Sequence, residues 1–360
     1  MIEQAYEFRM DGAPVSCAPY GNGHINHTYL VTDSTGRQYI LQRINRAVFR
    51  DPESLMANVS KITAHLLQTT GDPRRVLSLV PTRDNLEWLV DGDGEYWRLF
   101  HFIKNSVCFE TADTADIFRE SAVAFGRFQR QLADFPAHTL NETIPRFHDT
   151  PMRFSALRAA IGADARDRVK DAREEIAFAL EREQYGATLV NLQSSGDLPL
   201  RVTHNDTKLN NVIFDRDTLK AVCVIDLDTV MPGLSVNDYG DSIRFGASSA
   251  EEDEPDLSAV NFVFPLFEAY TDGFLSACGG SLTVREVERL RDGAKMMTLE
   301  CGTRFLTDYL SGDTYFHINY EVQNLNRCRT QFKLVKDMEA RWDEMQESIL
   351  RIYRGIISKT

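Results

Sequence analysis

The periodicity of the chain changes near residue 103, and this change constrains the fold more than any other feature of the sequence. Before it, short apolar runs separated by turn signals predict strands at 15–20, 28–31, 38–44, 86–90 and 96–103, the last two joined as a hairpin. A single helix is expected at 52–68, because Asp51 can cap it and Pro52 suits its first position. The first hundred residues therefore read as strands around one helix.

After residue 103, helical spacing dominates. Apolar residues recur at helical intervals over 117–132, 165–193, 257–277, 284–310 and 330–355. A strand-rich island at 198–202, 211–215 and 220–225 interrupts these helices. We predict an α+β chain of two lobes, a small β-rich N-terminal lobe (1–103) and a larger, mainly helical C-terminal lobe (104–360). The length of 360 residues agrees, since about 150 residues make one domain.

Composition limits the partners and the compartment. The formal net charge of −13 argues against nucleic acid or an anionic membrane as the main partner. We expect no membrane span and no signal peptide, because no stretch approaches the length of about 18 apolar residues and the first residues lack an apolar core. The six cysteines form no C-x-x-C pair, which predicts reduced thiols. From these features we expect a cytoplasmic protein.

The strand-rich island carries the residues that could perform chemistry. Its sequence runs His204-Asn205-Asp206-Thr207-Lys208-Leu209-Asn210-Asn211, and Ile225-Asp226-Leu227-Asp228 follows on the next apolar strand. Phosphoryl transfer needs a carboxylate beside the attacking hydroxyl and oxygen ligands that hold magnesium across the nucleotide phosphates. We predict Asp206 as the base, Asn211 and Asp226 as the Mg²⁺ ligands, and Lys208 as the group that stabilises the transferring phosphoryl. For Asp228 the pattern leaves open a metal, an orienting or a merely structural role.

The chain resembles the aminoglycoside phosphotransferase and choline kinase branch of the protein-kinase-like fold, and within it the N-acetylhexosamine 1-kinases most closely. The strings that carry this resemblance lie along the whole chain: Pro19 to Asn26, Tyr39 to Gln42, Phe147 to Pro151, Arg201 to Asn211, Ile225 to Thr229, Asp241 to Ala247, Glu300 to Gly302, Arg304 to Leu306 and Asp308 to Leu310.

The resemblance also implies roles for single residues. It implies that nucleotide is bound by Gly21, Asn22, Gly23, Gln42, Phe102 and Ile103, and that the sugar lies near Phe245, Arg304 and Tyr315. In addition, Asp238 resembles the carboxylate that braces the catalytic loop.

The chain departs from the family pattern on its third strand. Gln42 stands where a lysine is usual, and Arg43 beside it points to the opposite face of a strand. Since the helix at 52–68 has Glu53 only at its start, the usual lysine and glutamate pair cannot be drawn. How this lobe anchors phosphate is therefore open.

The resemblance implies an ATP- and Mg²⁺-dependent kinase that phosphorylates the anomeric hydroxyl of the small-molecule sugars N-acetylglucosamine or N-acetylgalactosamine. An alternative within the same family is a kinase for an aminoglycoside, choline or another sugar. A nucleotide-binding pseudokinase would fit the missing lysine but not the presence of Asp206, Asn211 and Asp226 together.

Overall fold

The structure is a computed structural model that describes residues 2–21, 25–112 and 114–358. It divides into two compact units. The first consists of Met1–Cys108, Asp134–Pro145 and Val212–Pro232, and the second of Phe109–Ala133, Arg146–Asn211 and Gly233–Thr360. Residues 212–232, which lie beyond the boundary expected at 103, thus group with the N-terminal strands. The two domains 1–103 and 104–360 stay a prediction.

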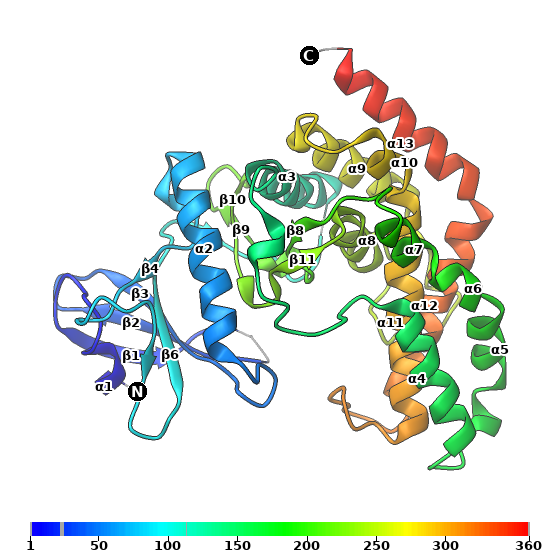
Figure 1. Cartoon of the computed structure of the whole chain (residues 1–360), viewed down its shortest axis with the longest axis horizontal. Helices are drawn as coiled ribbons and strands as arrows, with labels where there is room; N and C mark the ends of the chain where they lie inside the picture. The colour runs from blue at the N-terminus through cyan, green and yellow to red at the C-terminus, as the bar shows by residue number, and fades with distance from the viewer. Residues whose placement is uncertain (1, 22–24, 113, 359–360) are drawn as a thin grey trace. The chain divides into compact units, whose positions relative to one another are not determined.

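The first unit is built on two antiparallel sheets (Figure 1). The larger sheet has the strand order β1-β2-β3-β6-β4, and β5 also pairs with β6; the smaller has the order β10-β9-β7. The strands are β1 Pro14–Pro19, β2 His27–Asp33, β3 Gln38–Arg43, β4 Leu79–Val80, β5 Leu89–Val90, β6 Tyr96–His101, β7 Ser106–Val107, β9 Val212–Asp215, β10 Ala221–Val224 and, at the edge of the unit, β11 Met231–Gly233. The helices are α1 Ile2–Ala5 and α2 Pro52–Thr70, with 3-10 turns at Pro73–Arg75, Ala137–Thr139 and Leu227–Thr229.

The two faces of the larger sheet have different partners. One face carries an apolar cluster that includes Val31, Leu41 and Leu99 and packs with Phe8. The opposite face meets α2, because Arg98 approaches the sulfur of Met56 and the hydroxyl of Tyr96 donates to Glu53. Alternation of side chains across each strand assigns every residue of β3 and β6 to one of these two faces.

Local signals explain where α2 begins and ends. The side chain of Asp51 accepts a hydrogen bond from the backbone N–H of Ser54, and Pro52 occupies the first turn. Gly71 ends the helix in a left-handed conformation with φ 64°. The helix expected at 52–68 is therefore confirmed, with its end two residues later than expected.

The second unit is mainly helical (Figure 1). Its elements are α3 Ala115–Gln131, α4 Thr150–Ala163, α5 Arg173–Glu181, α6 Glu183–Gly186, α7 Thr188–Ser194, β8 Arg201–Thr203, α8 Ser235–Gly246, α9 Phe264–Cys278, α10 Val284–Glu288, α11 Leu290–Ser311, α12 Gln323–Ala340 and α13 Trp342–Ile357, with 3-10 turns at Val169–Asp171 and Leu209–Asn211. Helix α11 packs against α8, α12 and α4, while α3 packs against α9. A buried cluster that includes Leu157, Leu306, Tyr309 and Val335 fills the space between α4, α11 and α12.

Helices α8 and α11 approach each other through glycine. A Cβ atom added to Gly240 would lie 2.2 Å from the backbone oxygen of Gly293, and one added to Gly293 would lie 2.0 Å from that of Val236. Both distances are too short for real atoms. Glycine at these two positions therefore lets α8 lie directly against α11.

The structure differs from the sequence expectations in several elements. The hairpin around Asp91 is confirmed, but its first strand is only Leu89–Val90 rather than 86–90. Strands β4 and β7 and helices α4 and α8 were not expected. Residues 165–172 hold a 3-10 turn before α5 rather than the first part of a long helix. All six cysteines are described, and none of them forms a disulfide.

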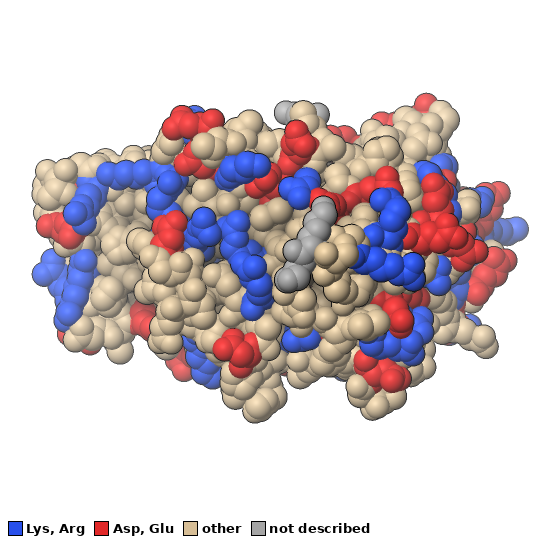
Figure 2. Space-filling model, turned by 90° about the horizontal axis from the view of Figure 1, so that it is seen from above, with Lys and Arg blue, Asp and Glu red and all other residues tan. Residues whose placement is uncertain are grey.

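The surface and the helices carry two further observations. On the face shown in Figure 2, Lys and Arg side chains are interspersed with Asp and Glu. Within the described ranges, none of the helices combines the length and the apolar character that a membrane span requires.

Candidate active site

A loop that follows β8 in the second unit carries the predicted catalytic residues. Its backbone turns sharply at Asn205, which has φ 65°. Asp238, fully buried on α8, accepts hydrogen bonds at 2.8 Å from the backbone N–H groups of both His204 and Asn205. The side chain of Gln129 donates a third hydrogen bond to the same carboxylate at 2.9 Å. Asp238 thus holds the loop in a conformation that a non-glycine residue rarely adopts.

Burial raises the pKa of Asp238 above its ordinary value, although the hydrogen bonds from His204, Asn205 and Gln129 act in the opposite direction. His204 itself is fully buried, and its Nδ1 accepts a hydrogen bond from the backbone N–H of Asp206 at 3.3 Å. This contact agrees with a role for His204 in fixing the loop.

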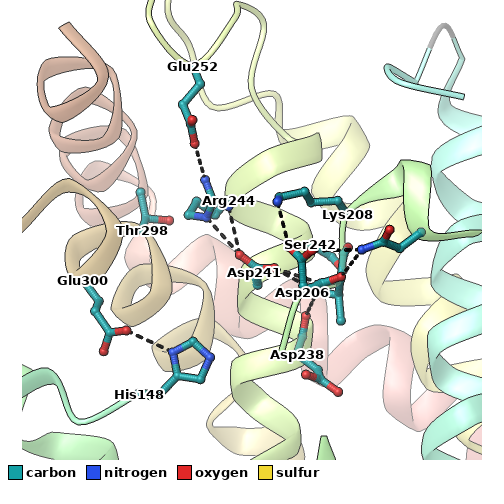
Figure 3. Close-up of polar contacts among 12 residues, drawn as sticks. His148, Asp206, Lys208, Asp238, Asp241, Ser242, Arg244, Glu252, Thr298 and Glu300 are labelled. Atoms are coloured by element: carbon teal, nitrogen blue, oxygen red, sulfur yellow. Dashed lines mark hydrogen bonds and ion pairs between the residues drawn. The ribbon is translucent and has the colours of Figure 1, made fainter. Parts of the chain in front are cut away.

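A second carboxylate of α8 supports the next part of the loop. Asp241 accepts a hydrogen bond from the backbone N–H of Thr207 at 2.9 Å, and the hydroxyl of Ser242 donates to the backbone oxygen of Thr207 at 2.8 Å. The guanidinium of Arg244 donates to Asp241 at 3.0 Å and also pairs with Glu252 at 2.7 Å (Figure 3). Burial alone would raise the pKa of Asp241, but the charges of Arg244 and Lys208 outweigh it and lower the pKa. Asp241 is therefore an anion that fixes the backbone directly after Asp206.

The side chain of Asp206 is held from two sides (Figure 3). Its Oδ1 lies 2.8 Å from the ammonium of Lys208, and its Oδ2 accepts a hydrogen bond at 3.0 Å from the amide of Asn211. The exposed fraction of the Asp206 side chain is 28% and that of Lys208 is 37%. The carboxylate can therefore meet a substrate from solvent while its orientation stays fixed.

Lys208 keeps its charge in this arrangement. Burial by itself lowers the pKa of an ammonium, but the charge of Asp206 and its hydrogen bond to Lys208 outweigh burial and raise the pKa. A cation thus lies beside the carboxylate that would receive the proton.

The donor set suits magnesium. The amide nitrogen of Asn211 donates to the backbone oxygen of Asp206 at 2.8 Å and to its carboxylate, so the amide oxygen is the atom that can ligate a cation. Oxygen is the ligand type that Mg²⁺ prefers. Across the described ranges, no group of three His, Cys, Asp or Glu side chains could form a metal site by itself. Mg²⁺ is usually held by one or two protein ligands together with substrate phosphates, and the amide oxygen of Asn211 could serve as one such ligand.

Asp226 belongs to the first unit, where it follows strand β10. Its backbone is left-handed, with φ 58° and ψ 61°, directly before the 3-10 turn Leu227–Thr229. A non-glycine residue in this conformation costs free energy and is concentrated at functional sites. Asp228, two residues later, is almost completely buried with an exposed fraction of 2%.

The predicted nucleotide residues lie in the first unit. Gly21 has φ 75°, while Asn22 and Gly23 lie outside the described residues. The ring of Phe102 contacts that of Tyr20 edge to face at 5.9 Å, and Ile103 is buried. Both ends of the Gln42 amide are engaged, since its oxygen accepts from Arg98 at 3.0 Å and its nitrogen donates to Thr28 at 3.1 Å. Gln42 is therefore part of a network inside the unit.

The structure brings two of the three predicted sugar residues together. The guanidinium of Arg304 lies 3.5 Å from the hydroxyl of Tyr315, whose exposed fraction is 71%, and also faces the rings of Phe147 and Phe316. Phe245 instead lines a cavity of about 510 Å³, together with Leu209 of the loop that carries the predicted catalytic residues. Neither Arg304 nor Tyr315 lines that cavity.

Sequence reasoning assigned no role to a buried pair that lies in the second unit. The Nδ1 of His148 lies 3.0 Å from a carboxylate oxygen of Glu300 (Figure 3). The hydroxyl of Thr150 donates to the other oxygen at 2.6 Å. Burial raises the pKa of Glu300, but His148 and Thr150 outweigh it and lower the pKa. His148 and Glu300 each lie within a sequence segment that carries the family resemblance. That resemblance was the only feature of the sequence that could have pointed to this pair.

A model of the phosphotransferase enzyme family matches residues 16–269. The chain belongs to this phosphotransferase family. Three solved structures resemble the phosphotransferase over nearly its whole length. A microcompartment-associated aminopropanol kinase is 16% identical with a TM-score of 0.62, and the match covers 96% of this chain and 97% of that one. The amicoumacin kinase hAmiN, solved with AMP-PNP, Ca²⁺ and Ami, is 14% identical with a TM-score of 0.62 and 92% coverage of each chain.

A choline kinase from Cryptosporidium parvum Iowa II is 12% identical with a TM-score of 0.52, and the match covers 91% of this chain and 90% of that one. At these identities the likeness concerns the fold. It confirms that the phosphotransferase has the predicted α+β, protein-kinase-like architecture, with a β-rich N-terminal part and a helical C-terminal part.

Proposed function

We propose that this phosphotransferase uses ATP and Mg²⁺ to phosphorylate the anomeric hydroxyl of N-acetylhexosamines, giving the sugar 1-phosphate and ADP. One observation carries the catalytic part of the proposal. Asp206 is partly exposed, and its carboxylate is oriented by Lys208 at 2.8 Å and Asn211 at 3.0 Å. A pseudokinase has no need for this arrangement. The choice of sugar rests on the resemblance of the sequence.

Each proposed site residue has its own role in phosphoryl transfer. Asp206 aligns the hydroxyl and takes its proton as the bond to phosphorus forms, and positioning matters more than basicity because the transition state is loose. Lys208, charged and beside Asp206, stabilises the charge of the transferring group. Asn211 and Asp226 would hold Mg²⁺, which supplies charge neutralisation to the nucleotide phosphates.

An anomeric hydroxyl suits a carboxylate base. The ring oxygen withdraws electrons, which makes this hydroxyl more acidic than the others of the sugar. Arg304 offers hydrogen-bond donors beside the aromatic surface of Tyr315 and Phe316, which is the chemistry that an acetamido oxygen and a sugar face would need.

One observation favours a second candidate, a kinase for a cationic alcohol. The cavity lined by Phe245 and Leu209 also contains Glu251, Glu252 and Glu254. Carboxylates of this kind could attract an amino alcohol or an aminoglycoside. Two of the structurally similar proteins are an aminopropanol kinase and a choline kinase.

A panel of acceptors with ATP and Mg²⁺ separates the two candidates. N-acetylglucosamine and N-acetylgalactosamine are compared with choline, 1-amino-2-propanol and an aminoglycoside, and ADP formation is measured for each. The proposal expects kcat/KM for an N-acetylhexosamine to exceed that for every cation by about 100-fold or more, since a site built for one set of polar groups rejects analogues that lack them. Turnover of a cationic alcohol alone would favour the second candidate.

A further inference from the structure

A row of polar side chains crosses the sheet of the first unit on the face that meets α2. Thr28 of β2, Gln42 of β3 and Arg98 of β6 are direct neighbours in the strand register. Arg98 donates to the amide oxygen of Gln42 at 3.0 Å, and the amide nitrogen of Gln42 donates to Thr28 at 3.1 Å. The residue that replaces the usual lysine thus faces an arginine on the adjacent strand.

Arg98 is too deeply buried to reach a nucleotide. Its exposed fraction is 2%, its guanidinium faces the ring of Phe100 at 5.2 Å, and one nitrogen lies 3.8 Å from the sulfur of Met56. A buried charge needs a partner of opposite sign. That partner is Asp228, whose carboxylate lies 2.5 Å from the guanidinium and is equally buried.

Asp228 has a second partner. The amide of Asn26 donates to its other oxygen at 2.6 Å, and the amide oxygen of Asn26 accepts from the backbone N–H of Asn45. Further along, Asn58 of α2 donates to the backbone oxygen of Val230 at 3.0 Å. The segment that follows Asp226 is therefore fixed at two points to the sheet and to α2.

We propose that Arg98 is a positioning residue that orients Asp226 through its ion pair with Asp228. Asp226 has a left-handed backbone that costs free energy, and the two residues that follow it connect it directly to the buried pair. Arg98 thereby contributes a buried cation to this unit, while Gln42 links it to the neighbouring strands. The inference rests on the proposed role of Asp226 as a Mg²⁺ ligand but not on the identity of the sugar.

The test measures the binding of ADP with and without Mg²⁺ by calorimetry, with no acceptor and no turnover. The double variant Arg98→Met and Asp228→Leu removes both charges, so it avoids an unpaired buried ion and should keep the fold. We expect its thermal unfolding to stay near that of wild type, its affinity for ADP alone to be unchanged, and the gain in affinity from Mg²⁺ to fall about tenfold or more.

Two further variants calibrate this result. Arg98→Lys keeps the charge that faces Asp228 and should retain the Mg²⁺-dependent gain within about threefold. The matched control removes the exposed ion pair between Arg37 and Asp11 of the same unit, through Arg37→Met and Asp11→Leu, and should leave the gain unchanged.

A folded Arg98→Met and Asp228→Leu variant that keeps the full Mg²⁺-dependent gain would overturn the inference. Should that variant not fold, Asn26→Ala decides, because it leaves the buried ion pair in place and removes the second hydrogen bond to Asp228, together with the acceptor of the Asn45 backbone N–H. The Asn26→Ala variant must lower the Mg²⁺-dependent gain in ADP affinity by about threefold or more, because it loses one charge-assisted hydrogen bond to Asp228. An unchanged gain in this variant would overturn the inference. If wild type itself binds ADP no better with Mg²⁺, the proposed function fails and the inference falls with it.

Discussion

The carboxylate of Asp206 and the side-chain amide of Asn211 are joined by a hydrogen bond of 3.0 Å. The predicted base and a predicted metal ligand are therefore oriented by each other within one loop. Because the amide nitrogen is used in this bond, the amide oxygen of Asn211 is left to face a cation. The two roles can be tested separately, Asp206 as the base through turnover and Asn211 as a metal ligand through the response to Mg²⁺.

Replacing Asp206 with Asn keeps the shape of the side chain and removes the proton acceptor. We expect kcat to fall by about 100-fold or more while ADP binding persists, since general-base catalysis contributes roughly that much. Steady-state kinetics and calorimetry measure the two quantities. The exposed Asp84→Asn variant serves as a control that should behave like wild type. An Asp206→Asn enzyme with near-normal turnover would show that Asp206 is not the base.

Asn211→Ala should change the response to metal. The variant loses an oxygen ligand, so the Mg²⁺ concentration that gives half-maximal activity should rise by about tenfold. Titrations of Mg²⁺ at saturating ATP check this expectation. The neighbouring Asn210, whose amide donates to Glu110, provides Asn210→Ala as the matched control. Identical titrations for Asn211→Ala and wild type would exclude Asn211 as a ligand.

Gly240→Ala should destabilise the second unit. The added Cβ would lie 2.2 Å from the backbone oxygen of Gly293, so α8 and α11 must move apart. We expect a loss of about 1–3 kcal/mol in the free energy of unfolding, as is typical of overpacking. Gly355→Ala, on α13, meets nothing within 4 Å and should be neutral or slightly stabilising. Equal stabilities of the two variants in urea would contradict this account of helix packing.

The pair of His148 and Glu300 predicts a pH dependence of stability. Because the pKa of Glu300 is lowered in the folded chain, the unfolded chain takes up the proton first as the pH falls. The stabilisation is therefore present above the ordinary value of 4.5 and is lost as the pH falls through the lower folded pKa. Glu300→Gln should be less stable than wild type near neutral pH, and the difference should shrink in acid.

Urea unfolding of wild type and Glu300→Gln at a series of pH values measures that difference. A stability difference that stays constant from neutral pH into acid would mean that the carboxylate of Glu300 makes no net contribution through its charge.

The sequence predicted the elements whose signals are local. Helix α2 was predictable because Asp51, Pro52 and a periodic apolar stripe lie together. The candidate catalytic loop could be located because its motif is continuous in the sequence, and its catalytic role stays a prediction. Helix α8 was not predictable, since residues 235–244 are all buried although they include the charged residues Asp238, Asp241 and Arg244, so residue type does not reveal burial there. That helix supplies Asp238 and Asp241, so the hydrogen bonds that hold the loop could be identified only from the structure.

The ion pair of Arg98 and Asp228 was hidden for a different reason. Arg98 stands in a strand among buried apolar residues, where an isolated arginine gives no pattern, and its partner lies far along the chain. Only the packing of residues 212–232 with the N-terminal strands brings the two charges together. The sequence left the role of Asp228 open, and the structure shows its carboxylate paired with Arg98.

The position of phosphorylation tests the central claim most directly. The products formed from N-acetylglucosamine, its methyl glycoside and its 6-deoxy analogue with ATP and Mg²⁺ are examined by phosphorus NMR. The proposed reaction predicts phosphate on the anomeric oxygen of the free sugar and of the 6-deoxy analogue, and no product from the methyl glycoside, whose anomeric oxygen is blocked. Phosphorylation of the methyl glycoside, or phosphate on O6 of the free sugar, would contradict a 1-kinase.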